Sequence, residues 1–485
     1  MQYSAVRAAI HIAAVFAIYL SLAMLIPAFV DVYYGNDDWQ VFTFSAIFTG
    51  GLALAVAMAT QGRLPAPSAR FGFLLVNLLW LTTAIAGAVP FMVSSLSLSV
   101  TDAFFESVSG ITTTGSTVIS GLDMAPPGIL MWRSLLTFMG GLGVIAFGLF
   151  LLPLLNIGGV NYFKIESSDI GDRPFERFRT FTISLFAVYT SLVAVCAICY
   201  TAAGMSGFNA VNHAMSTLAT GGFSTHDTSF LQYADRPAIL WIGSFFMFIG
   251  AMPFSIMILF AVKGRFDAIR DPQIKVFAGY SIAFALAVAI YLRVRDDVPF
   301  FDALTHSVFN FMSIITTTGL ASDDYTLWGP LAVVGIFVAT FLGGCSGSTT
   351  GGIKAYRFLI LFELLNNGLR RLVYPNTVLS VRYGDRVVDE SVQRAVVLFI
   401  ASFVVIWLIG AILLSATGLD FVTATTGALT ALTNVGPGLG NIIGPVGNFA
   451  SLNDAAKWIL SLLMLMGRLE ILAVLVIFTP VFWSR

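Results

Sequence analysis

The amino-acid sequence predicts an all-α protein that crosses a membrane many times and is built from four copies of one helical unit. Composition is the first observation. Of the 485 residues, 57% are hydrophobic and 11% are charged, whereas a soluble domain carries roughly 25% charged residues. The second is a series of apolar runs long enough to cross a bilayer. The third is a short phrase, ending in glycine, that occurs four times about every 100 residues.

The apolar runs give the expected elements in order. Residues 1–70 hold two leading helices, near 8–30 and 41–60. Each of the four units then has a spanning helix, a short re-entrant helix with its loop, and a second spanning helix. The units are expected at 71–165 (71–92, 101–114, 128–156), 166–265 (180–203, 208–221, 237–262), 266–370 (273–293, 301–318, 330–362) and 371–485 (392–414, 420–435, 454–482).

The short central segments, of roughly 12 residues, cannot cross the hydrocarbon layer, so each must re-enter. Irregular backbone at that depth is tolerated only where protein buries it or water lines it. Because every unit crosses twice, all four begin on the same side and the repeats are parallel. We therefore expect four parallel M1–pore helix–M2 repeats around a central pore.

The repeated phrases have the chemistry of a cation filter. Glycine lets the backbone adopt positive φ and turn its carbonyl groups inward, where they can replace the water shell of a cation. The carboxyl ends of the pore helices add partial negative charge. The alternative is that small residues merely allow close helix packing. The candidate filter residues are Thr113, Thr114, Gly115, Thr220, Gly221, Gly222, Thr317, Thr318, Gly319, Asn434, Val435 and Gly436.

Charge predicts the orientation. The loops 61–70, 157–179, 263–275 and 363–391, with both termini and the adjoining helix ends, hold most of the 25 Lys and Arg residues, so this face is expected to be cytoplasmic. The opposite face has Arg133, Arg236, Arg293, Arg295 and Lys457. It also has acidic residues that form a cation-attracting vestibule or only solubilise loops: Asp37, Asp38, Asp102, Glu106, Asp227, Asp296, Asp297, Asp323 and Asp324.

Two other sequence features exclude partners or cofactors. The net charge of −1 argues against a nucleic-acid partner. Cys196 and Cys199 form a CxxC pattern, but they lie within an apolar helix. Packed thiols are expected there rather than a metal or redox site.

Four motifs carry a family resemblance. They are TTTG at 112–115, ATGGFST at 219–225, TTTG at 316–319 and NVGPG at 434–438. They resemble the Trk/Ktr/HKT superfamily of potassium transporters, the bacterial Trk membrane subunit most closely, and the similarity covers essentially the whole chain. It implies that K⁺ is the transported ion and that Gly115, Gly222, Gly319 and Gly436 form the filter. Sodium-preferring relatives often carry Ser at the first position. The fourth motif departs from the pattern, so we expect an asymmetric filter.

A glycine-rich run at 341–352 interrupts the second spanning helix of the third unit. Each glycine costs a helix about 1 kcal/mol, so the backbone is expected to unwind and project into the pore. The run resembles the family's gating loop, with Gly343, Gly344, Ser346, Gly347, Ser348, Gly351 and Gly352 as candidate gating residues. A packing kink is the bland alternative. The segment 344–347 also matches the GxSG motif of an intramembrane serine protease, which would need a histidine base nearby. His213, His226 and His306 lie beside outer re-entrant segments.

Arg468 is a single charge deep in the last spanning segment, where it must face a partner or water. Snorkelling with help from Glu470 is one interpretation. The family resemblance instead implies a gating arginine beneath the filter, sharing its charge with Ser346, Ser348 and Thr349.

The resemblance also implies a homodimer, with a pore in each subunit, in the bacterial inner membrane. The same resemblance implies a cytoplasmic ring of nucleotide-binding regulatory subunits. The chain has no GxGxxG motif after a strand, so a nucleotide is expected to act through that partner. No enzymatic activity is expected. Segment 370–394 is a candidate docking surface or ordinary cytoplasmic charge. Two mechanisms stay open: a gated channel, and a symporter coupled to Na⁺ or H⁺. A carrier usually keeps an acidic residue at the membrane midplane, and the filter phrases contain none.

Overall fold

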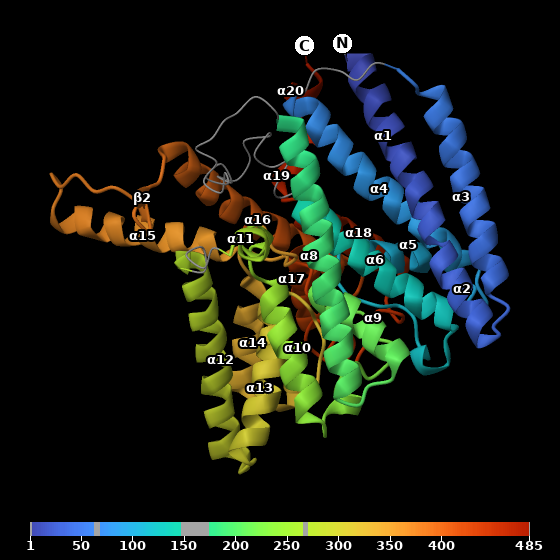
Figure 1. The fold of residues 1–485 in the computed structure, drawn as a ribbon. Coiled ribbons are helices and arrows are strands. Elements are labelled where there is room, and N and C mark those ends of the chain that lie inside the picture. The colour runs from blue at the N-terminus through green and yellow to red at the C-terminus, as the bar shows by residue number, and fades with distance from the viewer. Residues whose placement is uncertain (1, 63–67, 147–173, 265–269, 485) are drawn as a thin grey trace.

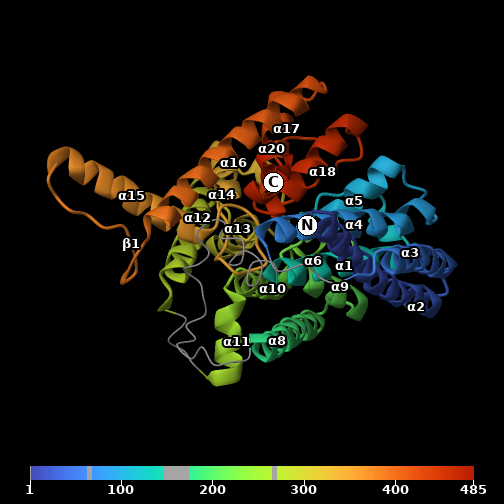
Figure 2. The same cartoon turned by 90° about the horizontal axis from the view of Figure 1, so that it is seen from above.

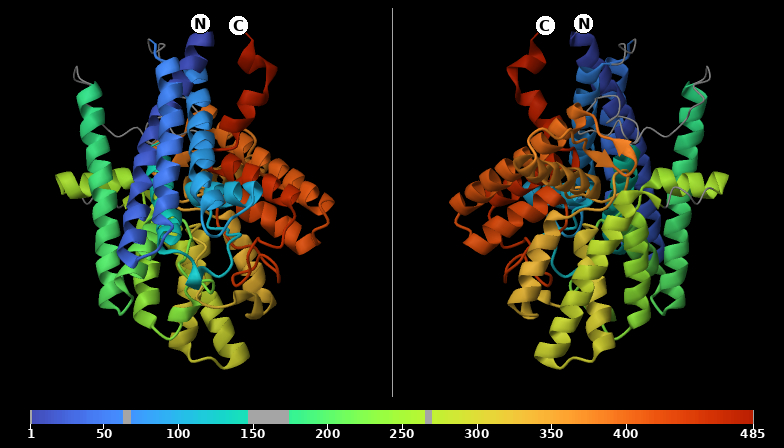
Figure 3. Two further views of the ribbon diagram at one scale, coloured as in Figure 1. Left: turned by 90° about the vertical axis from the view of Figure 1, so that its right-hand side faces the viewer. Right: turned by 90° about the vertical axis from the view of Figure 1, so that its left-hand side faces the viewer.

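The protein is almost entirely helical, and the computed structural model describes residues 2–62, 68–146, 174–264 and 270–484. Both termini lie at the same end of the bundle (Figure 1; Figure 3). The leading helices are α1 (Gln2–Ala23), α2 (Leu25–Tyr34) and α3 (Trp39–Ala59). Residues Ala5–Tyr34 count as a single apolar span.

Four groups of helices follow, in the order expected from the sequence. The first has α4 (Ala69–Val93), α5 (Val100–Ile111) and α6 (Pro127–Ala146). The second has α8 (Pro174–Ala202), α9 (Gly207–Leu218), α10 (Pro237–Gly250) and α11 (Phe254–Lys263). The third has α12 (Pro272–Asp296), α13 (Phe300–Ile315), α14 (Pro330–Phe341) and α15 (Ala355–Val373). The fourth has α16 (Glu390–Ala416), α17 (Phe421–Thr433), α18 (Asp454–Arg468) and α19 (Leu472–Leu475).

The remaining elements are short. A hairpin of β1 (Arg382–Tyr383) and β2 (Arg386–Val387) pairs antiparallel after α15. Seen from above, α15 and this hairpin extend away from the bundle (Figure 2). Single 3₁₀ turns occur at η1 (Leu122–Met124), η4 (Leu231–Tyr233), η6 (Tyr325–Leu327) and η7 (Val476–Phe478), and α20 (Pro480–Trp483) is the final helix.

Two second spanning helices that were expected to be continuous are broken. The axis bends by 96° between α10 and α11 and by 106° between α18 and the segment after it. Pro253 explains the first break, because proline lacks the N–H that a helix interior needs. At the second break Glu470 has φ of 60°, which no right-handed helix contains. The expected 128–156 helix is described only as far as Ala146, and its remainder lies outside the described residues.

In the described residues, seven helices are long and apolar enough to span a membrane, or nine if each bent pair is one span. The third unit is interrupted where the glycine run predicted, since α14 ends at Phe341 and α15 begins at Ala355.

Three of the four short central helices begin at a residue whose side chain caps the helix N-terminus. Ser99, Ser206 and Asp420 cap α5, α9 and α17 by accepting hydrogen bonds from backbone N–H groups in the first turn. Pro299 precedes α13. Each of the three caps satisfies one or two of the N–H groups that a helix start leaves without a partner in the helix.

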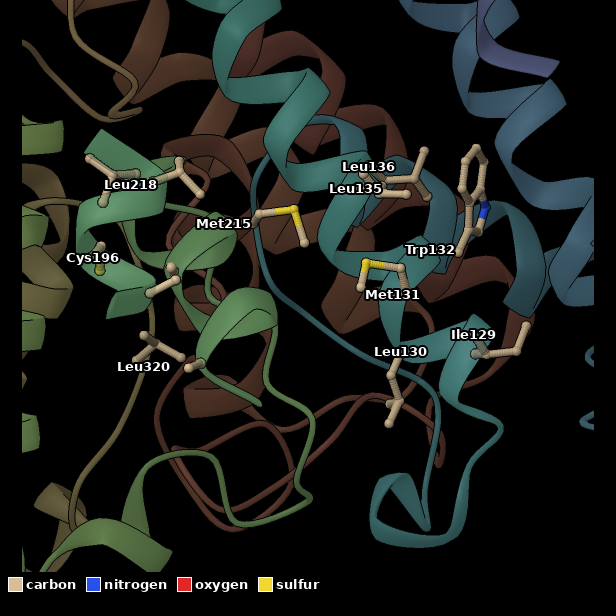
Figure 4. Close-up of a cluster of buried hydrophobic side chains, with 14 of the residues drawn as sticks. Ile129, Leu130, Met131, Trp132, Leu135, Leu136, Cys196, Met215, Leu218 and Leu320 are labelled. Atoms are coloured by element: carbon tan, nitrogen blue, oxygen red, sulfur yellow. The ribbon is translucent and has the colours of Figure 1, made fainter. Parts of the chain in front are cut away.

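Close packing of α6 against α4 and α5 depends on two glycines. A Cβ at Gly87 or at Gly110 would meet the Leu136 side chain at 3.0 to 3.1 Å, so Leu136 occupies the groove that these glycines leave open. Figure 4 shows Leu136 and Trp132 of α6 in a buried cluster that also receives Met215 and Leu218 of α9. Cys196 of α8 is buried in the same cluster, and its thiol and that of Cys199 are both free.

We predict that Leu136→Ala destabilises the purified protein by about 2 to 5 kcal/mol, because the side chain is fully buried and its removal leaves a cavity. Thermal melting in detergent measures the change. Leu81→Ala is the matched control, since Leu81 of α4 is 42% exposed. Equal melting temperatures for the two variants would contradict this packing.

Candidate functional site

The four repeated phrases adopt the same unusual backbone. Each loop has a first residue with φ of 50° to 58°, a middle residue without positive φ, and a glycine with φ of 71° to 103°. These triplets are 113–115, 220–222, 317–319 and 434–436. Left-handed backbone is costly for threonine, so surrounding structure must hold it. The divergent fourth loop keeps this conformation too, and its Asn434 is a residue type that tolerates it.

The four loops close into a ring. A Cβ added to any of the four glycines would collide with the carbonyl oxygen of the middle residue in the next loop. The contacts run from Gly115 to Gly221, from Gly222 to Thr318, from Gly319 to Val435 and from Gly436 to Thr114. The fourth loop therefore meets the first, and Ser116 Oγ adds a hydrogen bond to the Gly436 carbonyl at 2.9 Å. The structure thus brings all twelve candidate filter residues together.

Glycines of the second helices hold the pore-helix ends close to the ring. A Cβ at Gly140, Gly250 or Gly467 would press on the carbonyl of the residue four positions before the filter glycine in the same repeat. These carbonyls belong to Ile111, Leu218 and Leu432. The carboxyl ends of α5, α9 and α17, which carry partial negative charge, are therefore fixed beside the loops.

In the fourth loop, whose sequence differs from the other three, the Asn434 side chain makes hydrogen bonds that hold the loop in place. Asn434 Nδ2 donates to Thr114 Oγ1 at 3.0 Å and to the Met464 carbonyl at 2.9 Å. In the first and third loops the threonine hydroxyls on either side of the equivalent position pair with each other, Thr112 with Thr114 at 2.7 Å and Thr316 with Thr318 at 2.8 Å. Asn434 thus ties the fourth loop both to the first loop and to α18.

The irregular segment between α14 and α15 lies directly against the ring. Thr349 Oγ1 shares its one hydroxyl hydrogen between the carbonyls of Leu218 (3.1 Å) and Gly250 (2.9 Å) and accepts from Thr220 Oγ1 at 3.1 Å. Gly351 N donates to Thr317 Oγ1 at 2.7 Å, and Gly352 N donates to the Thr433 carbonyl at 2.9 Å. The segment therefore contacts the second, third and fourth repeats.

The rest of this segment is held by its own backbone and by neighbouring helices. Gly343 N bonds the Ile353 carbonyl, Gly344 packs against Ala251, and Ser346 N donates to Gln273 Oε1 at 2.9 Å. Ser348 Oγ donates to the Cys345 carbonyl at 2.6 Å. Gly347 and Gly352 have φ of 74° and 66°, which explains why glycine is required there.

The histidines have partners far from Ser346. His213 lies 3.0 Å from Ser224 Oγ, His226 pairs with Asp123, His306 lies 3.0 Å from Ser322 Oγ, and His11 lies 2.9 Å from the Ala57 carbonyl. No contact between Ser346 and a histidine occurs in the described part of the chain, so the GxSG match lacks the base that a serine protease needs.

Comparison with known proteins identifies the family. The TrkH family profile, described as "Cation transport protein", matches residues 40–484. The chain belongs to the TrkH family. It is 42% identical over 482 residues to the Trk system potassium uptake protein TrkI of Halomonas elongata, covering 98% of this chain and 96% of that protein. It is 36% identical over 492 residues to the TrkH protein of Salmonella typhimurium, covering 99% of each.

The fold is shared with a solved TrkH structure. The crystal structure of the potassium transporter TrkH from Vibrio parahaemolyticus superposes with a TM-score of 0.91 at 34% sequence identity and covers 100% of both chains. The all-α, multi-spanning fold class predicted from the sequence is confirmed by this agreement, and the resemblance to the Trk branch is confirmed by the relatives.

In this TrkH-family chain, Arg468 is the last residue of α18 and is 4% exposed. It lines a cavity beneath the ring together with Ser346, Gly351 and Lys354. Within the described residues, its three guanidinium nitrogens have no hydrogen-bond partner, so the expected sharing with Ser346, Ser348 and Thr349 does not occur as hydrogen bonds. Glu470 does not pair with Arg468 either, because it binds Arg357 at 2.5 Å.

A set of buried polar residues lies behind the ring and was not expected from the sequence. Glu106 was expected on the outer face, in a vestibule or a solubilised loop, but it is fully buried and accepts a hydrogen bond from Arg133 at 2.7 Å. The sequence did contain a signal for this role. Glu106 lies nine residues before Gly115, and the polar residues His213 and Asn310 lie at the same spacing before Gly222 and Gly319.

The outer acidic residues also leave less negative charge to attract cations than a vestibule would need, because some of their carboxylates are paired with basic side chains. Asp102 binds Lys457 at 2.6 Å, and Asp297 pairs with Arg293. The hydrogen bond from His226 holds the pKa of Asp123 below its ordinary value. That pairing therefore holds above the ordinary pKa of an aspartate and is lost as pH falls through the lowered pKa.

We predict that Gly115→Ser lowers the selectivity of the protein among monovalent cations. Serine at φ of 85° is strained by about 1 to 2 kcal/mol, and its Cβ would push the Gly221 carbonyl out of the ring. Reversal potentials under mixed K⁺ and Na⁺ measure the effect. Gly279→Ser is the matched control, because Gly279 has open space around it. An unchanged K⁺/Na⁺ ratio in Gly115→Ser would count against Gly115 lining the filter.

Proposed function

We propose that this chain takes up potassium ions across the bacterial inner membrane through a selective, gated, channel-like pore, as the membrane subunit of a Trk-type system. The observation that carries the proposal is the closed ring of four loops with alternating backbone handedness. The relatives named Trk system potassium uptake proteins support K⁺ as the transported ion. They also support a role in transport rather than in enzymatic catalysis.

In this mechanism the backbone carbonyls of the four loops replace the hydration shell of K⁺. Rigid packing between neighbouring loops keeps the carbonyls at a fixed spacing, and the helix ends behind them add negative potential. Each glycine is needed because the next loop leaves no room for a side chain. The ring thus supplies both the binding energy and the geometric selection.

The segment 343–352 acts as the gate. Its hydrogen bonds to Leu218, Thr317 and Thr433 hold it across the inner side of three of the four loops. Arg468 and Lys354 line the cavity next to it, and positive charge there raises the barrier for a cation. Opening would require this segment to move away from the ring.

Passive conduction is favoured over ion-coupled symport. The filter triplets contain no carboxylate, and the nearby Glu106 is already paired with Arg133. Single-channel recording in planar bilayers tests this point. Unitary K⁺ currents are expected, whereas a fixed stoichiometry of K⁺ to Na⁺ or H⁺ would establish a symporter.

The proposed function also includes an orientation in the membrane and an assembly with other subunits. The basic loops and both termini face the cytoplasm, which agrees with the two termini lying at one end of the fold. The chain forms a homodimer, and a ring of nucleotide-binding regulatory subunits docks on the cytoplasmic face, where segment 370–394 offers several arginines. Size-exclusion chromatography with light scattering tests the dimer.

We predict that Arg468→Ala raises K⁺ flux or flattens its voltage dependence, because it removes a positive charge from the ion path. The melting temperature should not fall, since the guanidinium has no hydrogen-bond partner in the described residues whose loss would cost stability. Arg468→Lys, which keeps the charge, is the control. Lower stability with unaltered flux per folded molecule would reject the role in the pore.

We predict that Thr349→Val raises basal rubidium uptake. The substitution keeps the size of the side chain but removes the hydroxyl that donates to the Leu218 and Gly250 carbonyls, a donation worth about 0.5 to 1.5 kcal/mol. Thr340→Val is the matched control, because the buried Thr340 hydroxyl bonds only the Ile336 carbonyl of its own helix in the described structure. If uptake by Thr349→Val stays at the wild-type level, the segment is a structural kink rather than a gate.

A further inference from the structure

Behind each filter loop, a polar group of the pore helix holds the chain just beyond the filter glycine. In the second repeat, His213 Nε2 lies 3.0 Å from Ser224 Oγ. In the third, Asn310 exchanges hydrogen bonds with Ser322 at 2.9 and 3.2 Å. In the fourth, the equivalent position is Gly427, and the neighbouring Thr426 hydroxyl accepts from Leu439 N at 3.0 Å.

The first repeat uses a charge instead. Glu106 accepts from Thr117 Oγ1 at 3.0 Å and from Val118 N at 2.9 Å, two and three residues past Gly115. Its remaining partner is Arg133 Nε at 2.7 Å. The side chains of Glu106 and Arg133 are 0% and 2% exposed, so the pair is shielded from water and its geometry is strongly constrained.

Arg133 also reaches into the second repeat. Its Nη1 donates to the Ser224 carbonyl at 2.7 Å, and its guanidinium lies 4.1 Å from the centre of the Phe223 ring. Phe223 and Ser224 follow Gly222 directly. The planar guanidinium of Arg133 therefore links the Glu106 carboxylate, which holds the first loop, to the Ser224 carbonyl, which lies just beyond the second loop. A lysine has a single side-chain nitrogen and cannot reproduce this geometry.

The geometry points to the Glu106–Arg133 pair as a positioning pair that sets ion selectivity by fixing the first and second filter loops relative to each other. It rests on the proposed function, because it assigns residues to the selectivity of the same ring. Arg133 turns the Ser224 carbonyl toward itself and thus sets the peptide orientation at the outer end of the second loop. Loss of this link would let the two loops shift independently and widen the coordination of the ion.

The test compares Arg133→Gln and Arg133→Lys with wild type in planar bilayers and by thermal melting. We expect both variants to lower the K⁺/Na⁺ permeability ratio about tenfold or more, the factor that one charge-assisted hydrogen bond is worth. Arg133→Lys should keep a melting temperature nearer to that of wild type, because it preserves the buried positive charge opposite Glu106.

Lys457→Met is the matched control. Lys457 forms a partly buried outer pair with Asp102 at 2.6 Å, and its hydrogen bonds in the described residues go to Asp102 and Ala450 rather than to a filter loop. It should lower the melting temperature and leave the ion ratio unchanged. A similar loss of selectivity in Lys457→Met would overturn the proposal, since general destabilisation would then explain the effect. An Arg133→Lys protein with wild-type selectivity would also overturn it.

For variants that conduct poorly, ion binding can be measured instead from the rise in melting temperature that K⁺ or Na⁺ produces. K⁺ should raise the melting temperature of the wild-type protein more than Na⁺ does, because an ion that binds the folded state stabilises it. This difference should shrink in Arg133→Gln and persist in Lys457→Met, and an undiminished difference in Arg133→Gln would overturn the proposal. Absence of any cation flux through wild type would instead overturn the proposed function, and it would be seen before the variants are compared.

Discussion

Contact between a glycine of one ring loop and a backbone carbonyl of the next is the interaction on which the rest of the structure depends. It recurs at all four junctions, and at each the partner carbonyl occupies the place of a side chain. Such contacts require left-handed backbone, which threonine adopts only at a cost. The caps of the pore helices, the glycines of the second helices and the buried core around α6 together hold this conformation in place.

The four repeats are similar in backbone but different in the groups that support it. Glu106, His213 and Asn310 occupy the same position and contact the same part of their loops. Because each uses a different chemistry, the ring has pseudo-symmetry without equal environments. The most polar support is at the junction of the first and second loops, where Arg133 is shared. Asymmetry therefore extends beyond the divergent fourth motif.

Breaks in the second helices give the inner side of the ring its own architecture. Helix breaks in the second, third and fourth repeats place irregular backbone, rather than straight helices, beneath the loops. The third break supplies the segment that contacts three loops. The fourth ends α18 at Arg468 and frees Glu470 to pair with Arg357 on α15 at 2.5 Å. The break after α18 and the helix that extends away from the bundle are thus joined by an ion pair in which the Arg357 side chain is buried.

The sequence by itself determined the helical class, the order of the helices, the four repeated triplets and the interruption after Phe341, because hydropathy and the glycine-ended phrases can be read directly from the chain. Tertiary structure alone decided the break after Arg468 and the partner of Glu470, whereas the break after Gly250 has a local cause in Pro253. It also decided that Glu106 and Arg133 are buried together rather than exposed at the outer surface. These features depend on contacts such as that between Arg133 and Ser224, 91 residues apart. A charged residue near a helix end looks the same in sequence whether it meets water or a distant carboxylate, and only the packed fold decides which.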